Sequence, residues 1–157
     1  MTAKSTLVGK SIADLPFTST QGEQSHFQQW QGKNLLLYFY PKDNTPGCTQ
    51  ESKEFAQLYP QFLNLDTEIL GISRDSLKSH DNFRCNYDLP FHLISDQDQA
   101  ICQHFSVLKE KSMFGKKSLG IERSSFLIDK KGVIRKEWRN VKVPGHAAEV
   151  LAAVKEL

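Results

Sequence analysis

The order of apolar and polar positions along this chain predicts alternating strands and helices. Residues 35–40, Leu-Leu-Leu-Tyr-Phe-Tyr, are an unbroken apolar run of strand length, as in a strand buried on both faces. Residues 50–59 are polar with apolar residues at helical spacing. The same spacing continues through Phe62 and Leu65, so we expect this helix to extend past Pro60 with a kink.

Shorter patterns predict the remaining elements. Strands are expected at 68–73, within 89–95 after Pro90, at 124–128 and at 133–138, with a hairpin turn at 129–132. Helices are expected at about 76–87 (capped by Asp75 or Ser76), at about 97–105 (capped by Asp96), and from Gly145 or His146 to about Lys155. The lysine-rich stretch 107–118 is expected to be a loop, and 17–20 and 24–27 to form a hairpin around Gln21-Gly22-Glu23.

This order of elements indicates an α/β fold with a central mixed sheet and helices on both faces. The sequence contains no internal repeat, linker or low-complexity segment, so residues 1–157 are expected to form one domain.

Composition excludes several classes of function. The net charge of +2 gives no electrostatic case for nucleic acid or a membrane surface, and no apolar run is long enough to span a bilayer. The N-terminus lacks the apolar region of a signal peptide. The five histidines are scattered and no Cys-x-x-Cys is present, so no metal site and no cofactor are expected. Three cysteines fit a reducing compartment, and we expect a cytoplasmic protein.

Cys48 is the strongest candidate for chemistry. Pro41, Pro46 and Gly47 break the chain after the buried strand and bring Cys48 into the first turn of the following helix. The unpaired N–H groups and the positive dipole end of that turn favour thiolate, the reactive form of cysteine. At about 100° per residue, Cys48 shares the inward face with Phe55, so it is expected to lie in a pocket. The alternative is a small buried apolar residue that starts a core helix.

Two motifs resemble those of the peroxiredoxins. Pro41-x-x-x-Thr45-x-x-Cys48 resembles their peroxidatic motif, and the fuller string 40–49 resembles the bacterioferritin comigratory protein / peroxiredoxin Q subfamily. Residues 120–129 resemble the family's second motif, which bears Arg123, and the resemblance runs from about Gly9 to the C-terminus. It implies a thioredoxin-like fold with an N-terminal β-hairpin extension and a thiol-dependent peroxidase that uses no cofactor.

The resemblance also implies roles for individual residues. Arg123, which would lie at a strand start beside the cysteine loop, favours the thiolate and hydrogen-bonds the peroxide. Thr45 bonds the peroxide and the thiolate, and Pro41 shields the sulfur from water. Without the motif these three would be interpreted as an exposed arginine, a turn or N-cap residue and a strand terminator. Glu51 is expected to be an exposed carboxylate on the helix face rather than a neighbour of the site.

The sulfenic acid formed at Cys48 needs a second thiol. Many relatives carry it five residues after the first cysteine, where this chain has Lys53. Cys85 lies on the polar side of the helix at about 76–87, which resembles peroxiredoxin Q members with a resolving cysteine in that helix. Cys102 sits in an apolar helix and is expected to be buried, although it and an external thiol remain alternatives.

The resulting hypothesis is a peroxidase that reduces hydrogen peroxide and organic hydroperoxides and is recycled by thioredoxin or a glutaredoxin-type donor. An intramolecular Cys48–Cys85 disulfide and a monomer are expected, since the last helix is followed by no cysteine-bearing arm. Because one cysteine is in a pocket and the other outside, both helices are expected to unwind locally during turnover. The alternatives are a one-cysteine peroxidase, a thioredoxin-like disulfide oxidoreductase, and a redox-sensing or holdase module.

Overall fold

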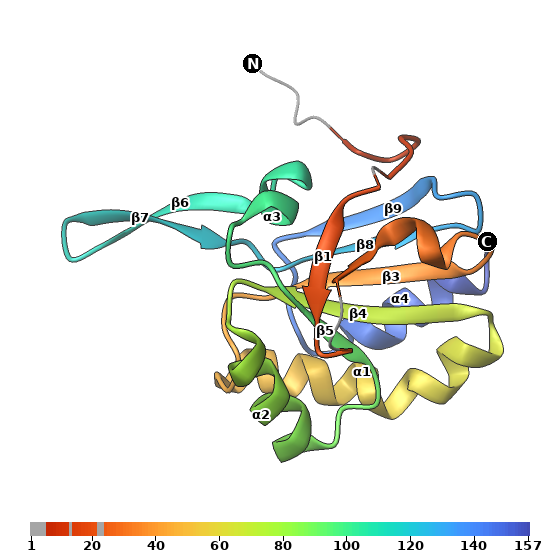
Figure 1. The fold of residues 1–157 in the computed structure, drawn as a ribbon, viewed down its shortest axis with the longest axis horizontal. Helices are drawn as coiled ribbons and strands as arrows, with labels where there is room; N and C mark the ends of the chain where they lie inside the picture. Colours follow the sequence, from red (N-terminus) through yellow and green to blue (C-terminus); the bar gives the residue numbers. More distant parts are fainter. Residues whose placement is uncertain (1–5, 13, 22–23) are drawn as a thin grey trace.

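A seven-stranded mixed sheet forms the centre of the molecule (Figure 1). The computed structural model describes residues 6–12, 14–21 and 24–157. The strand order is β2-β1-β5-β4-β3-β8-β9. The strands are β1 (Pro16–Ser19), β2 (Gln24–His26), β3 (Asn34–Phe39), β4 (Thr67–Ser73), β5 (His92–Ser95), β8 (Ser124–Ile128) and β9 (Ile134–Arg139). A separate hairpin consists of β6 (Leu108–Met113) and β7 (Lys116–Ile121), and it projects away from the body.

The central strand β3 is buried on both faces, as its unbroken apolar run predicted. Leu36, Tyr38 and the following Tyr40 belong to one apolar core, whereas Leu37 and Phe39 belong to the other. This alternation follows from the twofold side-chain period of a strand, and it fixes β3 between two layers of the fold.

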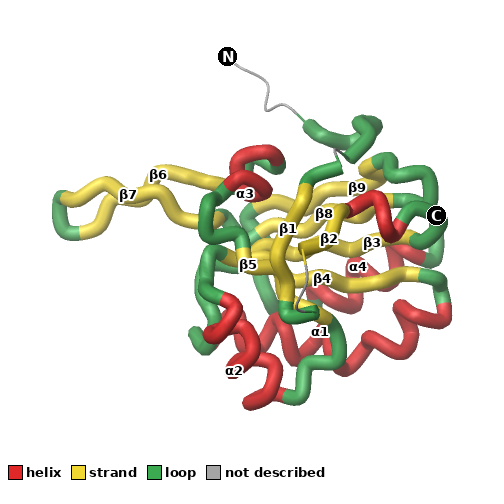
Figure 2. Tube along the Cα trace, viewed as in Figure 1, coloured by secondary structure: helices red, strands yellow, loops and turns green. Residues whose placement is uncertain are grey.

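Helices cover both faces of the sheet (Figure 2). The helices are α1 (Pro46–Asn64), α2 (Leu77–Tyr87), α3 (Ala100–His104) and α4 (His146–Val154), with a short 3₁₀ helix η1 at Phe27–Trp30. Phe55 of α1, Phe83 of α2 and Val150 of α4 pack into the first core, and Ile101 of α3 packs into the second. The expected helices on both faces are therefore confirmed.

The strand directions bring distant residues to one edge of the sheet. Strands β3, β4 and β5 are parallel, so their carboxyl ends lie together, and β8 runs antiparallel to β3. Phe39 at the end of β3 pairs with Ser124 at the start of β8. The residue before β8, Arg123, is consequently placed beside the loop that follows β3.

Two of the expected elements were wrong in whole or in part. Residues 107–118 are not a loop: they form most of the β6–β7 hairpin, whose two-residue turn has positive φ at Phe114 and Gly115. The helix expected at about 97–105 is shorter, because Gln99 adopts φ 64° and ends a turn that starts at Asp96. The N-cap residue is Gln99 and not Asp96 as expected, although the Asp96 carboxylate accepts hydrogen bonds from the N–H groups of Ile101 and Cys102 in the first turn.

The remaining predicted elements are present with ends shifted by a few residues. α1 continues through Pro60 to Asn64, and Ser76 caps α2 by accepting a hydrogen bond from Ser79 N. β1 and β2 form the N-terminal hairpin, whose expected turn residues Gly22 and Glu23 lie outside the described residues. Within the described ranges, each helix is too short or too polar to cross a lipid bilayer.

Candidate functional site

Cys48 lies in the first turn of α1, directly after the loop that leaves β3. Thr45 is the N-cap residue in extended conformation, Pro46 starts the helix, and Cys48 is its third residue. The side chain of Cys48 points into the first core and is 1% exposed. Its sulfur is therefore screened from bulk water and close to the free N–H groups of the helix start, which stabilise an anion.

Arg123 supplies a positive charge to this sulfur. Its Nη2 lies 3.4 Å from Cys48 Sγ, and its Nη1 donates a hydrogen bond of 2.7 Å to Glu51 Oε1. The backbone of Arg123 is itself fixed, because its carbonyl accepts a hydrogen bond from Val141 N. One guanidinium group thus joins the candidate nucleophile to a carboxylate one turn further along α1.

The expectation that Glu51 is an exposed carboxylate was wrong. Glu51 is 2% exposed, and within the described structure its second oxygen, Oε2, is buried without a hydrogen-bond partner. The expectation rested on residue type, because a glutamate is rarely buried; the guanidinium of Arg123, 72 residues further along the chain and directly before β8, pairs with this one. The charge of Arg123 is what makes the buried carboxyl tolerable.

Burial and the Arg123–Glu51 ion pair act in opposite directions on the pKa of each of the two side chains. Burial raises the pKa of Glu51 to about 7, although the charge and hydrogen bond of Arg123 lower it. Burial alone lowers the pKa of Arg123, but Glu51 and Cys48 reverse this effect and hold it above its ordinary value. Arg123 therefore remains a cation beside the sulfur throughout the neutral pH range.

Thr45 and Pro41 lie on the same loop as Cys48. The Thr45 hydroxyl donates a hydrogen bond of 2.8 Å to the carbonyl of Lys42, so its oxygen retains lone pairs that can accept. Thr45 holds the N-cap position, but within the described residues its side chain makes no capping hydrogen bond. Pro41 is half-buried at the end of the run that begins in β3.

Aromatic packing beneath α1 fixes the position of its first turns. The Tyr38 hydroxyl lies 2.9 Å from the hydroxyl of Ser52, and the Tyr38 ring stacks on Phe55 at 4.8 Å between centroids. Gly71 of β4 makes room for that ring, because a Cβ there would lie 2.8 Å from Tyr38 Cζ. The helix that carries Cys48 is thus held over the sheet by buried contacts.

The other two cysteines have different surroundings. Cys85 is exposed on α2, on the side that the helical spacing indicated, and Cys102 is buried in α3. Burial raises the pKa of the Cys102 thiol well above its ordinary range, and a hydrogen bond with Asp96 raises it further. All three thiols are free, and a pairing of buried Cys48 with exposed Cys85 requires backbone movement.

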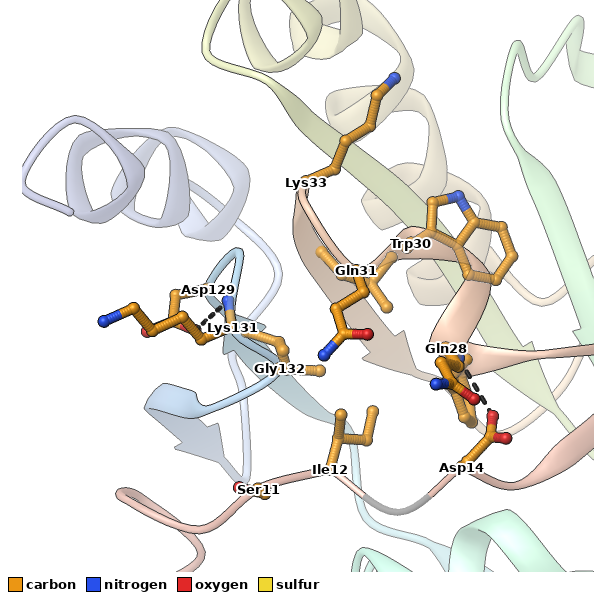
Figure 3. Close-up of a pocket in the computed structure, with 13 residues that line it drawn as sticks. Ser11, Ile12, Asp14, Gln28, Trp30, Gln31, Lys33, Asp129, Lys131 and Gly132 are labelled. Atoms are coloured by element: carbon orange, nitrogen blue, oxygen red, sulfur yellow. Dashed lines mark hydrogen bonds between the residues drawn. The ribbon is translucent and has the colours of Figure 1, made fainter.

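Two of the hollows on the described structure lie near opposite ends of β3. A groove beside the start of α1 is lined by Pro46, Thr49, Lys53 and, from the end of α2, Tyr87. A cavity of about 290 Å³ lies near the start of β3, between η1, the N-terminal segment and the β8–β9 turn (Figure 3). In it Gln28 N donates to the Asp14 carboxylate, and Gln31 and Ile12 point toward each other across the space. This cavity is at the opposite end of β3 from Cys48.

Comparison with known proteins decides the family. The pattern of the AhpC/TSA family matches residues 8–137. Peroxiredoxin Bcp of Xanthomonas campestris pv. campestris is 51% identical over 142 residues, which cover 90% of this chain and 89% of that protein. This chain belongs to the peroxiredoxins. Peroxiredoxin Bcp of Bacillus subtilis is 44% identical and matches over 96% of each chain.

Solved structures agree with this membership. Peroxiredoxin Q of Xanthomonas campestris superposes with a TM-score of 0.88 at 51% identity, over 91% of this chain and 90% of that one. A cysteine-to-serine mutant of PrxQ from Xylella fastidiosa superposes with a TM-score of 0.92 at 42% identity, over 98% of each chain. The thioredoxin-like fold and the peroxiredoxin Q subfamily implied by the motifs are confirmed, and the protein is a thiol-dependent peroxidase.

Several residues of this peroxiredoxin were missed by the sequence interpretation. Glu51 was assigned to solvent, and His80 was counted among scattered histidines. The structure places His80 at 0% exposure against Asp43, two residues before Thr45. The available signal was the histidine itself, which occupies a position on the otherwise polar helix α2 that faces inward with Phe83.

Proposed function

We propose that this peroxiredoxin reduces hydrogen peroxide and organic hydroperoxides through a two-cysteine cycle. The Cys48 thiolate attacks the terminal oxygen of ROOH, the O–O bond breaks, and RO⁻ takes up a proton to leave as ROH. The Cys85 thiol then attacks the Cys48 sulfenic acid, which forms a disulfide and releases water. Two thiols of a thioredoxin-type donor, or of a glutaredoxin-type donor, reduce the disulfide and complete the cycle.

The observation that carries this proposal is the contact between Arg123 Nη2 and Cys48 Sγ at the start of α1. A fixed cation and free backbone N–H groups surround the sulfur, so negative charge is stabilised both on the thiolate and on the departing oxygen. The Thr45 hydroxyl donates a hydrogen bond to the Lys42 carbonyl of the same loop. We propose that it exchanges this hydrogen bond for one to the peroxide. Pro41 is proposed to limit the access of water to the sulfur.

Two observations support Cys85 as the resolving residue. It is exposed, so a thiol is available there, whereas Cys102 is buried with a raised pKa that keeps it protonated. The groove between the start of α1 and Tyr87 adjoins both segments that must approach each other. An intramolecular disulfide is then made by one chain alone, which fits a monomer, and its reduction fits the cytoplasm.

The substrate range draws support from a relative. A solved structure of bacterioferritin comigratory protein from Xanthomonas campestris, 50% identical over 91% of this chain, is described with alkyl peroxide reduction activity. Because hydrogen peroxide is smaller than an alkyl hydroperoxide and offers the same O–O bond to the Cys48 thiolate, we extend the proposal to both substrates.

Peroxide-dependent NADPH consumption with thioredoxin and thioredoxin reductase tests the cycle. Cys48→Ser is expected to abolish turnover, and Cys85→Ser to abolish turnover with thioredoxin while still forming a sulfenic acid. Cys102→Ser is the matched control and should turn over at the wild-type rate. Full turnover by Cys85→Ser would contradict the two-cysteine cycle and indicate an external resolving thiol. A wild-type protein that is oxidised once without cycling would indicate a redox sensor instead.

A further inference from the structure

A buried pair of polar side chains joins the cysteine loop to α2. Asp43 Oδ2 lies 2.7 Å from His80 Nδ1, and the two side chains are 1% and 0% exposed. The same carboxylate accepts hydrogen bonds from the hydroxyls of Tyr40 at 2.6 Å and Ser79 at 2.8 Å. Both oxygens of Asp43 are thus engaged in hydrogen bonds.

Both ring nitrogens of His80 face hydrogen-bond acceptors. Its Nε2 lies 2.9 Å from the carbonyl oxygen of Ile94, which can only accept a hydrogen bond. Its Nδ1 faces the Asp43 carboxylate, and the nearby Tyr40 hydroxyl already donates to Asp43. These contacts are both satisfied as hydrogen bonds when both ring nitrogens donate, which makes Asp43 and His80 a charge pair.

The atoms of Asp43, Asp75 and His80 lie close enough to one another to hold a metal ion. The hydrogen bonds argue for a different role. Both nitrogens of His80 already face acceptors, and Asp75 Oδ2 accepts from Asp43 N and from the Ser73 hydroxyl. A metal would have to displace at least the contact of one His80 nitrogen, so the existing contacts favour a charge pair.

The charge pair connects two segments that the proposed cycle requires to move. Asp43 lies in the loop that leads into α1, five residues before Cys48, and His80 lies five residues before Cys85 in α2. Three hydrogen bonds join Asp43 to α2 and to the segment directly before it. The Asp43 carboxylate contacts Ser79 and His80, and the Asp43 backbone N–H donates to Asp75. If one segment unwinds, the buried charge of the other loses its partner, and an unpaired buried charge is strongly unfavourable.

We propose that the Asp43–His80 pair couples the opening of the Cys48 loop to the opening of α2, so that both cysteines become mobile together. The loop cannot open alone without leaving His80 unpaired, and α2 cannot unwind past His80 without freeing Asp43. His80, Asp43 and Ser79 are positioning residues: they touch neither peroxide nor sulfur. The consequence for turnover rests on the proposed role of Cys85, whereas the coupling itself does not.

Hydrogen exchange of the reduced protein tests the coupling with Ser79→Ala, a half-buried position on α2. Loss of a hydrogen bond to a charged acceptor should raise exchange by about tenfold, and by the same factor in residues 43–52 and 77–87. Ser79→Thr retains the hydroxyl and should restore the wild-type rates. Acceleration confined to α2, with the cysteine loop unchanged, would overturn the proposal.

Two further measurements keep the test independent of one variant. Thr67→Val removes a buried hydroxyl at the opposite end of β4, and it should leave exchange in both segments unchanged. Nitrogen NMR of the wild-type protein at neutral pH should show both ring nitrogens of His80 protonated. A neutral ring with one bare nitrogen would overturn the charge pair.

The peroxide reaction separates this proposal from the proposed function. At high peroxide, Ser79→Ala should form more disulfide and less Cys48 sulfinic acid than the wild type, because the opened segments meet sooner. If exchange rises jointly in both segments but the ratio of disulfide to sulfinic acid is unaffected, the coupling stands and the role of Cys85 fails. If the ratio changes without joint exchange, the coupling is contradicted and the role of Cys85 is retained.

Discussion

At the scale of single residues, the reactivity that we propose for Cys48 depends on the position of one guanidinium group. Arg123 reaches the sulfur with Nη2 while Nη1 is held by Glu51, and Gly47 leaves the space in which Nη2 lies. A substitution at Glu51 or at Gly47 should therefore shift the Arg123 guanidinium and leave its positive charge in place.

Gly47→Ala should slow the reaction of Cys48 with peroxide. The added Cβ would lie 3.2 Å from Arg123 Nη2, so the guanidinium must shift away from the sulfur. We expect a loss of about tenfold in the second-order rate constant for hydrogen peroxide, less than the loss of a whole charge-stabilising donor. Thermal stability should change little, because only the end of a flexible side chain moves. Gln50→Ala, exposed on the same helix, is the control, and equal rates in the two variants would contradict the account.

Glu51→Gln should remove one component of the pH dependence of stability. The folded-state pKa of about 7 lies above the ordinary value of 4.5, so the contribution of Glu51 is complete below the lower value and is lost as pH rises through the higher one. The difference corresponds to about 3 kcal/mol in the free energy of unfolding. Urea unfolding of wild type and variant at about pH 4.5 and about pH 8 measures it.

Glu156→Gln, at an exposed position after α4, is the control for this experiment. It should retain the wild-type pH dependence. If Glu51→Gln shows the same change with pH as the wild type, the buried carboxyl does not titrate as the structure indicates.

The sequence indicated the proposed site residues better than their partners. Cys48, Thr45 and Arg123 lie in motifs, and the structure brings Cys48 and Arg123 together. Glu51 and His80 were missed because the residues that pair with them are distant in sequence, so no partner within either helix indicated a buried polar contact. A polar residue on an inward helix face was the only available signal.

At the scale of elements, β3 and α1 act as one unit. The buried strand presents Tyr38 to α1, and the Tyr38–Ser52 contact sets the height of the helix start above the sheet. Gly71 of the neighbouring strand is what permits this arrangement, because Tyr38 and Leu93 occupy the space of a Cβ.

Gly71→Ala should destabilise the protein by overpacking. The added Cβ would lie 2.7 Å from Leu93 Cδ2 and 2.8 Å from the Tyr38 hydroxyl, closer than carbon atoms approach. We expect a loss of about 1–3 kcal/mol in the free energy of unfolding, measured by urea titration. Ser118→Ala, exposed on β7, should be neutral within about 0.5 kcal/mol. A Gly71→Ala variant as stable as Ser118→Ala would show that the contact is not rigid.

Elements were predictable from periodicity except where two signals competed. Four lysines made 107–118 look like a loop, yet Phe114-Gly115 supplies the positive φ angles of a tight hairpin turn and the flanking residues pair as β6 and β7. The helix α3 begins at Ala100 instead of about residue 97, because Gln99 takes a left-handed conformation that its residue type did not predict.

At the scale of the whole molecule, the sheet assembles the site from three distant segments. The parallel order β3-β4-β5 with β8 antiparallel to β3 places the cysteine loop, Arg123 and the start of α2 at one edge. The cavity of about 290 Å³ at the other end of β3 lies apart from this edge. The topology therefore positions the proposed chemistry, while the cysteine loop and α2 supply the parts that we propose to move.

The central claim is that Cys48 reacts with peroxide and Cys85 resolves it. The most direct test is peptide mapping by mass spectrometry after one equivalent of hydrogen peroxide, under non-reducing conditions. The account predicts a linked pair of peptides that contains Cys48 and Cys85, with Cys102 still a free thiol. Cys48 found as sulfenic or sulfinic acid with Cys85 free, or linked to Cys102, would contradict it.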